Sequence, residues 1–154
     1  MSDERAKGAE QLALTLIDGG LQRMAARVLA LFLFTERETL TMGEIAERLD
    51  ISAGSVSGTV KSLLSTGLIE RIPAPGSRRE HYRMRDNAWA ILFTSQNAVT
   101  KGLLAAADSS LAAIPEADPA HHRLAQMRDF YQFMLEEIPA LIERWQDTQA
   151  PHSG

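Results

Sequence analysis

The run from Thr41 to Met84 restricts the fold more than any other part of the chain. Thr41 and Glu44 have the spacing of a capping box, in which each side chain accepts a hydrogen bond from the backbone amide of the other residue. We therefore predict a short helix that begins after Thr41 and ends at about Leu49 or Asp50. Residues 50–52 then form a tight turn, and Ser52 is suited to cap the N-terminus of a second helix.

The second helix is bounded by equally local signals. Ile51 and Val56 stand at the two positions of a hydrophobic staple around Ser52. Gly67 supplies the left-handed residue that commonly follows a helix end, so the helix should end at about Thr66.

A change of hydrophobic period follows Gly67. Residues 68–72 and 81–84 alternate in polarity, which is typical of strands, and residues 73–77 between them include two prolines and a glycine. This pattern predicts a β-hairpin with a long tip. A short helix, a three-residue turn, a second helix and a hairpin in this order form a winged helix-turn-helix. The expected fold class is therefore mainly α with a small β-hairpin wing.

Helical patterns flank this core on both sides. Stretches at about 8–17 and 21–36 precede it, and the second of these is apolar around most of its circumference, as a central buried helix would be. After the core we expect one long helix at about 88–113, for which Asp86 and Asn87 are candidate caps. Asp118 and Pro119 predict the start of a last helical region, in which Pro139 should cause a kink or a restart.

The charge of the chain is unevenly distributed. The formal net charge is −4, yet residues 51–85 hold six basic side chains against two acidic ones. A basic segment on an acidic protein favours a local contact with a polyanion. The alternative is that these are ordinary solvated side chains.

The outward face of the second helix fits that contact. At 100° per residue the core-facing side carries Val56, Val60, Leu63 and Leu64, and the opposite face carries small or hydroxylated residues and one lysine. Such a backbone can approach a groove floor closely, while its hydroxyl groups bond base edges or phosphates. The candidate DNA contacts on this helix are Ser52, Gly54, Ser55, Ser57, Gly58, Lys61 and Ser62. The alternative is a serine-rich face that is simply solvated.

The hairpin tip supplies the remaining candidates. Arg78 and Arg79 stand where a wing reaches the flanking minor groove, whose narrow form attracts arginine. Arg83 lies nearer the hairpin base, where it can contact phosphates. Alternatively, Arg78 and Arg79 merely pair with Glu80 or with other acidic neighbours.

These residues resemble a known family. The run LTMGEIAERLDISAGSVSGTVKSLLSTGLIERIPAPGSRREHYRM resembles the DNA-binding core of the MarR family of bacterial regulators, and GGLQRMAARVLALFLF resembles its GbsR-like subgroup and actinobacterial relatives. The likeness extends from about residue 10 to residue 147. In the wing the family commonly has Asp-x-Arg, whereas this chain has Gly76, Ser77, Arg78 and Arg79, so the acidic residue that would orient the arginine is missing.

The resemblance implies a homodimer that represses a gene by binding a pseudo-palindromic operator in double-stranded DNA. We expect a dimerisation helix in residues 1–20, the DNA-binding core in 21–86, dimerisation helices in 87–147 and a loose tail in 148–154. Apolar residues at helical spacing agree with this expectation, although packing within one chain is the alternative. The candidate dimerisation residues are Leu12, Leu16, Phe130, Met134, Ile138, Leu141 and Trp145.

The resemblance also implies a small apolar effector that relieves repression. Family members often bind such molecules between the dimerisation helices and the DNA-binding head. The candidates here are Leu33, Phe34, Trp89 and Phe93, and the alternative is that these side chains are plain core.

Catalytic chemistry finds little support in the sequence. There is no cysteine, no glycine-rich phosphate loop and no paired-carboxylate pattern, and the adjacent His121 and His122 do not have the spacing of a helical metal site. We expect no enzyme activity, no cofactor, no metal and no membrane span, and the N-terminal residues do not resemble a signal peptide, so a cytoplasmic location is expected. The main rival function is a winged helix that binds a protein partner instead of DNA.

Overall fold

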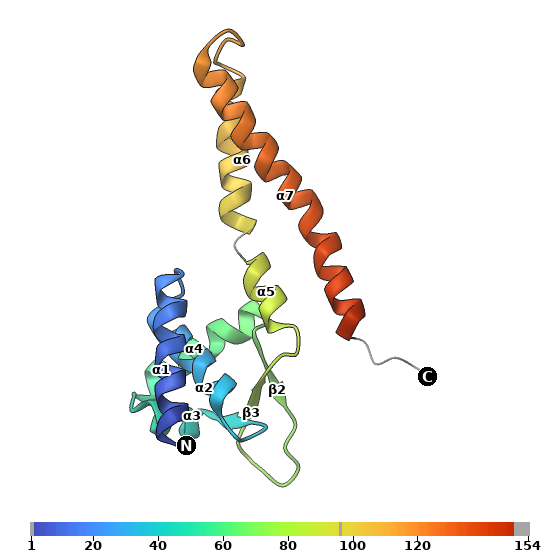
Figure 1. The fold of residues 1–154 in the computed structure, drawn as a ribbon. Coiled ribbons are helices and arrows are strands. Elements are labelled where there is room, and N and C mark those ends of the chain that lie inside the picture. Colours follow the sequence, from blue (N-terminus) through green and yellow to red (C-terminus); the bar gives the residue numbers. More distant parts are fainter. Residues whose placement is uncertain (1, 96, 150–154) are drawn as a thin grey trace. The chain divides into compact units, whose positions relative to one another are not determined.

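The computed structural model describes residues 2–95 and 97–149, which divide into two compact units that meet between Ala88 and Trp89 (Figure 1). The first unit contains the predicted winged helix-turn-helix, and the second contains further helices. The elements of the first unit are α1 (Asp3–Asp18), α2 (Arg23–Phe34), β1 (Leu40–Thr41), α3 (Met42–Leu49), α4 (Ala53–Thr66), β2 (Ile69–Ile72) and β3 (His81–Met84). The next elements are α5 (Ala88–Thr94), α6 (Asn97–Leu111) and α7 (Pro119–Gln149).

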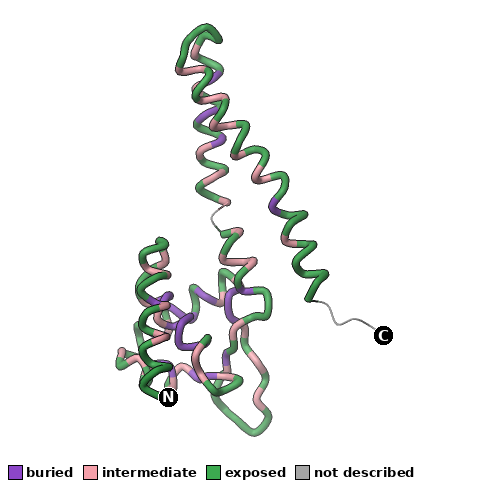
Figure 2. The backbone as a smooth tube through the Cα atoms, in the orientation of Figure 1, coloured by how far each residue is buried: buried purple, intermediate pink, exposed green. Residues whose placement is uncertain are grey.

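The core of the first unit forms around α2, as its nearly continuous apolar sequence predicts. Val28 and Leu29 are at most 1% exposed, and Ile45 of α3, Val60 of α4 and Tyr82 of β3 close around them with no exposed surface. Figure 2 shows this concentration of buried residues in the first unit. Burial of such side chains is the main stabilising contribution to a domain of this size.

The helix ends follow the predicted local signals. Thr41 accepts from the amide of Glu44 at 3.2 Å, and the Glu44 carboxylate accepts from the amide of Thr41 at 2.8 Å, which completes the capping box. Ser52 caps α4 by accepting from the amide of Ser55 at 3.2 Å. Gly67 ends α4 with φ of 79°, a conformation that costs glycine little.

The hairpin is also confirmed, but the sheet has a third strand that the sequence analysis missed. The strand order is β1-β3-β2, all antiparallel, with Leu40 opposite Tyr82 on one side and Arg71 opposite Tyr82 on the other. A strand of two residues is too short to show an alternating pattern in the sequence. It is recognised only by its pairing with β3. The strand ties the segment before α3 directly to the wing.

The second unit departs from prediction at its start. Instead of one helix over 88–113, α5 ends at Thr94 and α6 begins at Asn97. The Thr94 hydroxyl donates to the carbonyl of Ala90 at 2.9 Å and the Ser95 hydroxyl donates to that of Leu92 at 2.7 Å. Thr59 makes the same kind of bond inside α4 without ending that helix, so these bonds do not by themselves explain the end at Thr94.

Helices α6 and α7 pack against each other, and α7 does not restart at Pro139, which excludes one of the two outcomes predicted there. Asp118 accepts from the amide of Ala120 at 2.8 Å and so caps α7, as expected. The helix then continues through Pro139 without restarting. Proline has no amide hydrogen, so the carbonyl four residues earlier lacks its helical donor. Because Pro139 is exposed, water can donate a hydrogen bond to that carbonyl instead. Helix α7 extends to Gln149, past the predicted start of the tail at residue 148, and residues 150–154 lie outside the described residues.

Within residues 2–95 and 97–149, no helix combines the length and the apolar character needed to cross a bilayer.

Candidate nucleic-acid interface

Helix α4 exposes the polar face that its sequence predicts. Val56, Val60 and Leu63 are at most 2% exposed, so this side of the helix packs into the core. The candidate contacts on the other side are exposed apart from Ser57, which is half-buried; the exposed ones are Ser52, Gly54, Ser55, Gly58, Lys61 and Ser62. The helix therefore offers hydroxyl groups and one ammonium group to a partner.

Two glycines leave the α4 backbone open to close approach. A Cβ atom added at Gly54 or at Gly58 would meet no other atom within 4 Å. Since the two residues are one helical turn apart, they share one side of the helix. A groove floor can approach the backbone here more closely than at a position with a larger side chain.

The wing tip is built by a tight turn that the prolines and the glycine determine. The amide of Ser77 donates to the carbonyl of Ala74 at 3.1 Å, and Gly76 between them has φ of 81°. Pro75 followed by a glycine with positive φ is the sequence of a type II turn. Arg78 and Arg79 follow this turn directly, and both are exposed.

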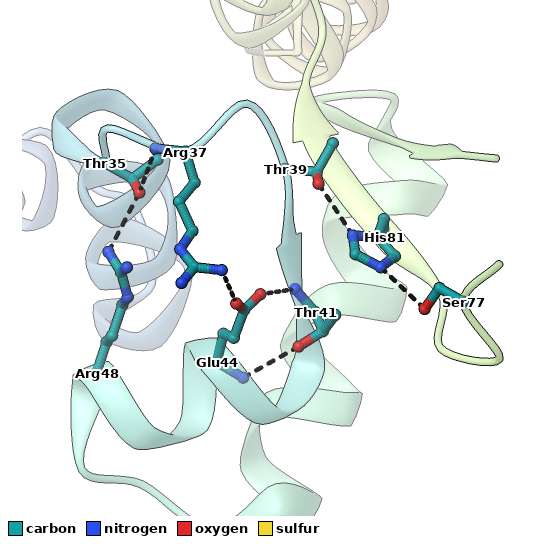
Figure 3. Close-up of polar contacts among 8 residues, drawn as sticks. All are labelled: Thr35, Arg37, Thr39, Thr41, Glu44, Arg48, Ser77 and His81. Carbon is teal, nitrogen blue, oxygen red and sulfur yellow. Dashed lines mark hydrogen bonds and ion pairs between the residues drawn. The ribbon is translucent and has the colours of Figure 1, made fainter. Parts of the chain in front are cut away.

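Ser77 organises the turn at the tip of the wing. Its hydroxyl accepts from the amide of Arg79 at 3.2 Å and lies 3.2 Å from Nε2 of His81. Nδ1 of His81 lies 3.0 Å from the hydroxyl of Thr39. Figure 3 shows His81 between these two hydroxyls, linking the wing to the segment before β1. The link could not be predicted from the sequence, because it depends on the pairing of β1 with β3.

The base of the wing is electrostatically neutralised by Glu70. Its carboxylate accepts from Arg83 at 2.9 Å and from Arg85 at 3.4 Å, and Glu70 stands opposite Arg83 in the strand register. The hydrogen bond from Arg83 is the largest cause that lowers the pKa of Glu70. Arg83, a predicted phosphate contact, is therefore already paired within the protein.

Glu80 neutralises Arg71 of β2 in the same way. It accepts from the hydroxyl of Tyr82 at 2.6 Å, and its carboxylate lies 3.4 Å from Nε of Arg71. The bond from Tyr82, followed by the charge of Arg71, lowers the pKa of Glu80, while burial raises the pKa of Tyr82. Glu80 thus contacts Arg71 and not the two arginines of the tip.

The basic residues of the segment therefore fall into two groups. Within the described ranges 2–95 and 97–149, the ion pairs take up Arg71, Arg83 and Arg85 and leave Lys61, Arg78 and Arg79 without an acidic partner. The alternative, in which Arg78 and Arg79 pair with Glu80, is wrong, because Glu80 pairs with Arg71. Positive charge is free at the tip of the wing and on the outward face of α4, as a polyanion site requires.

The other predicted residues are distributed over both units. On α7, Phe130, Leu141 and Trp145 are each more than half exposed, whereas Ile138 is buried and Met134 is half-buried. Leu12 and Leu16 of α1 are half-buried, whereas Leu14, a large apolar residue of that helix that the prediction omitted, is exposed.

The four predicted effector residues are divided between the units. Leu33 and Phe34 belong to α2 and are exposed and half-buried, respectively, whereas Trp89 and Phe93 belong to α5 and are 46% and 58% exposed. An effector pocket that uses all four stays a prediction.

Of the two adjacent histidines in α7, His121 makes a local contact at the start of the helix. Nδ1 of His121 lies 2.9 Å from the carbonyl of Ile114, which ties the start of α7 to the loop before it. His122 is exposed. Across the described residues, no group of three His, Asp or Glu side chains is arranged to hold a metal ion.

Models of protein families match both parts of the chain. Residues 19–80 match the MarR family, and residues 87–148 match the model described as MmpR5-like MarR family transcriptional regulator. The first match covers the helix-turn-helix, and the second covers the helices after it.

Individual proteins match over most of the chain. The HTH-type transcriptional regulator MmpR5 of Mycobacterium tuberculosis is 31% identical over 137 residues, which are 88% of this chain and 83% of that protein. A crystal structure of a transcriptional regulator is 29% identical, with a TM-score of 0.73, and the alignment covers 94% of this chain and 99% of that one. These likenesses extend well beyond the helix-turn-helix.

Proposed function

The chain belongs to the MarR family of transcriptional regulators, and on that basis we propose that α4 enters the major groove of an operator while the wing tip contacts the flanking minor groove. One observation carries the proposal: the open face of α4 occurs in the same unit as Arg78 and Arg79, which have no acidic partner within residues 2–95 and 97–149, while neighbouring arginines are neutralised. The bases are contacted by the serines of α4, and Lys61 contacts phosphate.

A homodimer that binds a pseudo-palindromic operator and represses a nearby gene completes the proposal. The exposed apolar residues of α7, which include Phe130, Leu141 and Trp145, support a second copy as the partner. Two heads would bind half-sites about one helical turn, ~34 Å, apart.

The remaining finer assignments are also proposals. They are a small apolar effector that binds at Leu33, Phe34, Trp89 and Phe93 and relieves repression, a place in the GbsR-like subgroup and a cytoplasmic location. The effector acts by preferring an arrangement of the two heads that does not fit the operator.

The DNA-binding proposal is tested by fluorescence anisotropy with the DNA upstream of the gene that encodes the chain, at two or more salt concentrations. The Arg78→Ala/Arg79→Ala double variant should bind at least about tenfold more weakly and should reduce the slope of log K against log salt by about 1 to 2, because each lost phosphate contact lowers it by about 0.9. Arg83→Ala should have the smaller effect, since Glu70 already holds that guanidinium.

Arg123→Ala is the matched control, because Arg123 is an exposed arginine of α7 that makes no ion pair within the described residues. An equal loss in the control and the double variant would show that binding depends on overall charge and would overturn the site. Specific binding that is unchanged in the Arg78→Ala/Arg79→Ala double variant would also overturn the site. Absence of binding to any operator-length DNA would favour the rival function, in which the winged helix binds a protein.

A further inference from the structure

A cavity lies between α1, α2 and the end of α3, entirely within the first unit. Its volume is about 290 Å³. Pockets for small organic ligands begin at roughly 300 Å³, so this one suits a small molecule and not a large cofactor. Its lining does not include the candidate DNA contacts of α4 and the wing or the four predicted effector residues.

Three arginines line this cavity. Arg23 and Arg27 lie one turn apart on α2, and Arg48 lies near the end of α3. In the part of the chain that the structure describes, none of the three forms an ion pair. One carboxylate, that of Glu10, also lines the cavity, so the four charged side chains carry a net positive charge.

The arginines are only partly occupied by the protein. Arg27 donates through Nη2 to the carbonyl of Leu49 at 2.8 Å, and Arg48 donates through Nη1 to the hydroxyl of Thr35 at 3.2 Å. Each guanidinium has five N–H donors in a planar fork, so donors remain for a ligand. Arg23 is exposed and is the least constrained of the three.

The uncharged walls are aliphatic throughout. They are formed by alanines of α1 and α2 together with leucine and isoleucine side chains, such as Ala13, Ile17 and Leu31. Ala13 and Leu31 are at most 6% exposed, so the floor is firmly packed. Because no ring among these lining residues offers a stacking surface, a flexible hydrocarbon chain fits them better than a planar aromatic molecule.

We propose that this cavity binds a straight-chain aliphatic carboxylate. The hydrocarbon chain lies between α1 and α2, and the carboxylate accepts hydrogen bonds from Arg23 and Arg27. A planar carboxylate matches the guanidinium fork, and such charge-assisted bonds are roughly twice as strong as neutral ones. The proposal does not depend on DNA binding, because every residue that it uses lies outside the candidate nucleic-acid interface.

Isothermal titration calorimetry of the full chain tests the proposal with octanoate, 1-octanol and benzoate. Octanoate should bind in a saturable manner, and 1-octanol and benzoate should bind more weakly, because one lacks the charge and the other lacks the chain. Arg23→Gln should weaken octanoate binding about tenfold or more, since a hydrogen bond between ionised partners is lost. The same variant should leave 1-octanol binding unchanged.

Two further variants separate the site from surface adsorption. Arg123→Gln, in α7, should leave octanoate binding unchanged. Ala9→Leu, which adds volume to the α1 wall, should weaken octanoate and 1-octanol together. Circular dichroism melting shows whether each variant is folded. If Arg23→Gln does not fold, Ala9→Leu still tests whether octanoate binds in this cavity.

Several outcomes would overturn the site. They are no octanoate binding, equal affinity for octanoate and 1-octanol, or an equal loss in Arg23→Gln and Arg123→Gln. Tighter binding of benzoate than of octanoate would overturn the assignment of an aliphatic ligand.

Discussion

The two units of the chain differ in how much of their backbone belongs to buried residues (Figure 2). In residues 2–88 large apolar side chains such as Leu29 and Tyr82 are at most 1% exposed. In α7, Phe133 and Trp145 are more than half exposed. The first unit therefore builds a core from its own residues, whereas the second presents the kind of apolar surface that commonly marks an interface.

The comparison explains where stability and association should reside. Removing a buried side chain leaves a cavity and loses apolar burial, while truncating an exposed one loses little within the chain. Mutations in the first unit should therefore change folding, and mutations on the exposed face of α7 should change assembly.

The largest expected effect is on the core of the first unit. Leu29→Ala should lower the free energy of unfolding by about 3 kcal/mol, because Leu29 is 1% exposed. Phe133→Ala, at 59% exposure, should lower it by less than about 1 kcal/mol in a dilute sample. Urea denaturation followed by circular dichroism measures both, and equal losses would break the comparison.

The next effect concerns assembly through α7. Trp145→Glu should raise the dissociation constant of the proposed dimer at least about a hundredfold, roughly 2.7 kcal/mol, because it places a charge in an apolar interface. Analytical ultracentrifugation measures the change, and helix content should stay the same. Gln126→Glu, an exposed position on the same helix, is the control. A dimer that tolerates Trp145→Glu would refute the role of this residue.

The smallest effect tests a local stabilising contact of the first unit. Glu44→Ala should lower the free energy of unfolding by about 1 kcal/mol at neutral pH, since it removes the carboxylate that accepts from the amide of Thr41. That backbone bond is the largest cause that lowers the pKa of Glu44 below its ordinary value of 4.5.

The contribution of Glu44 therefore has a defined pH dependence. A carboxyl group with a lowered pKa stabilises the folded state above its unfolded pKa, and this contribution is lost as the pH falls through the folded pKa. The difference between the wild type and Glu44→Ala should shrink below about pH 4.5. Glu47→Ala removes a neighbouring exposed carboxylate, and its difference from the wild type in the free energy of unfolding should not shrink as the pH falls. If it does, the effect is a general one of charge.

Local signals explain the parts that were predicted correctly. The capping box at Thr41, the cap at Ser52 and the positive φ at Gly67 each depend on residues within three or four positions of one another. The burial of Val56 and Val60 follows from helical periodicity alone. Such features could be deduced from the sequence because each residue pattern favours one local conformation.

The errors arose where a contact is distant or where a helix ends inside an apolar pattern. β1 exists because Leu40 pairs with Tyr82, and no local pattern predicts that pairing. The end of α5 at Thr94 interrupts a segment whose apolar pattern favours one continuous helix. At Pro139 the continuing helix excludes a restart, one of the two outcomes predicted there.

The sequence by itself determined the order of α3, α4 and the hairpin, the caps of α3, α4 and α7, the core-facing side of α4 and the basic character of the wing. These follow from spacing, periodicity and charge, which are properties of neighbours in the chain. Only the tertiary structure decided which charges remain free. Glu70 pairs with Arg83 and Arg85, and Glu80 pairs with Arg71, whereas the two arginines at the wing tip have no acidic partner among the described residues. Strand pairing brings together residues that are far apart in the sequence, and the distance between opposite charges determines whether they pair.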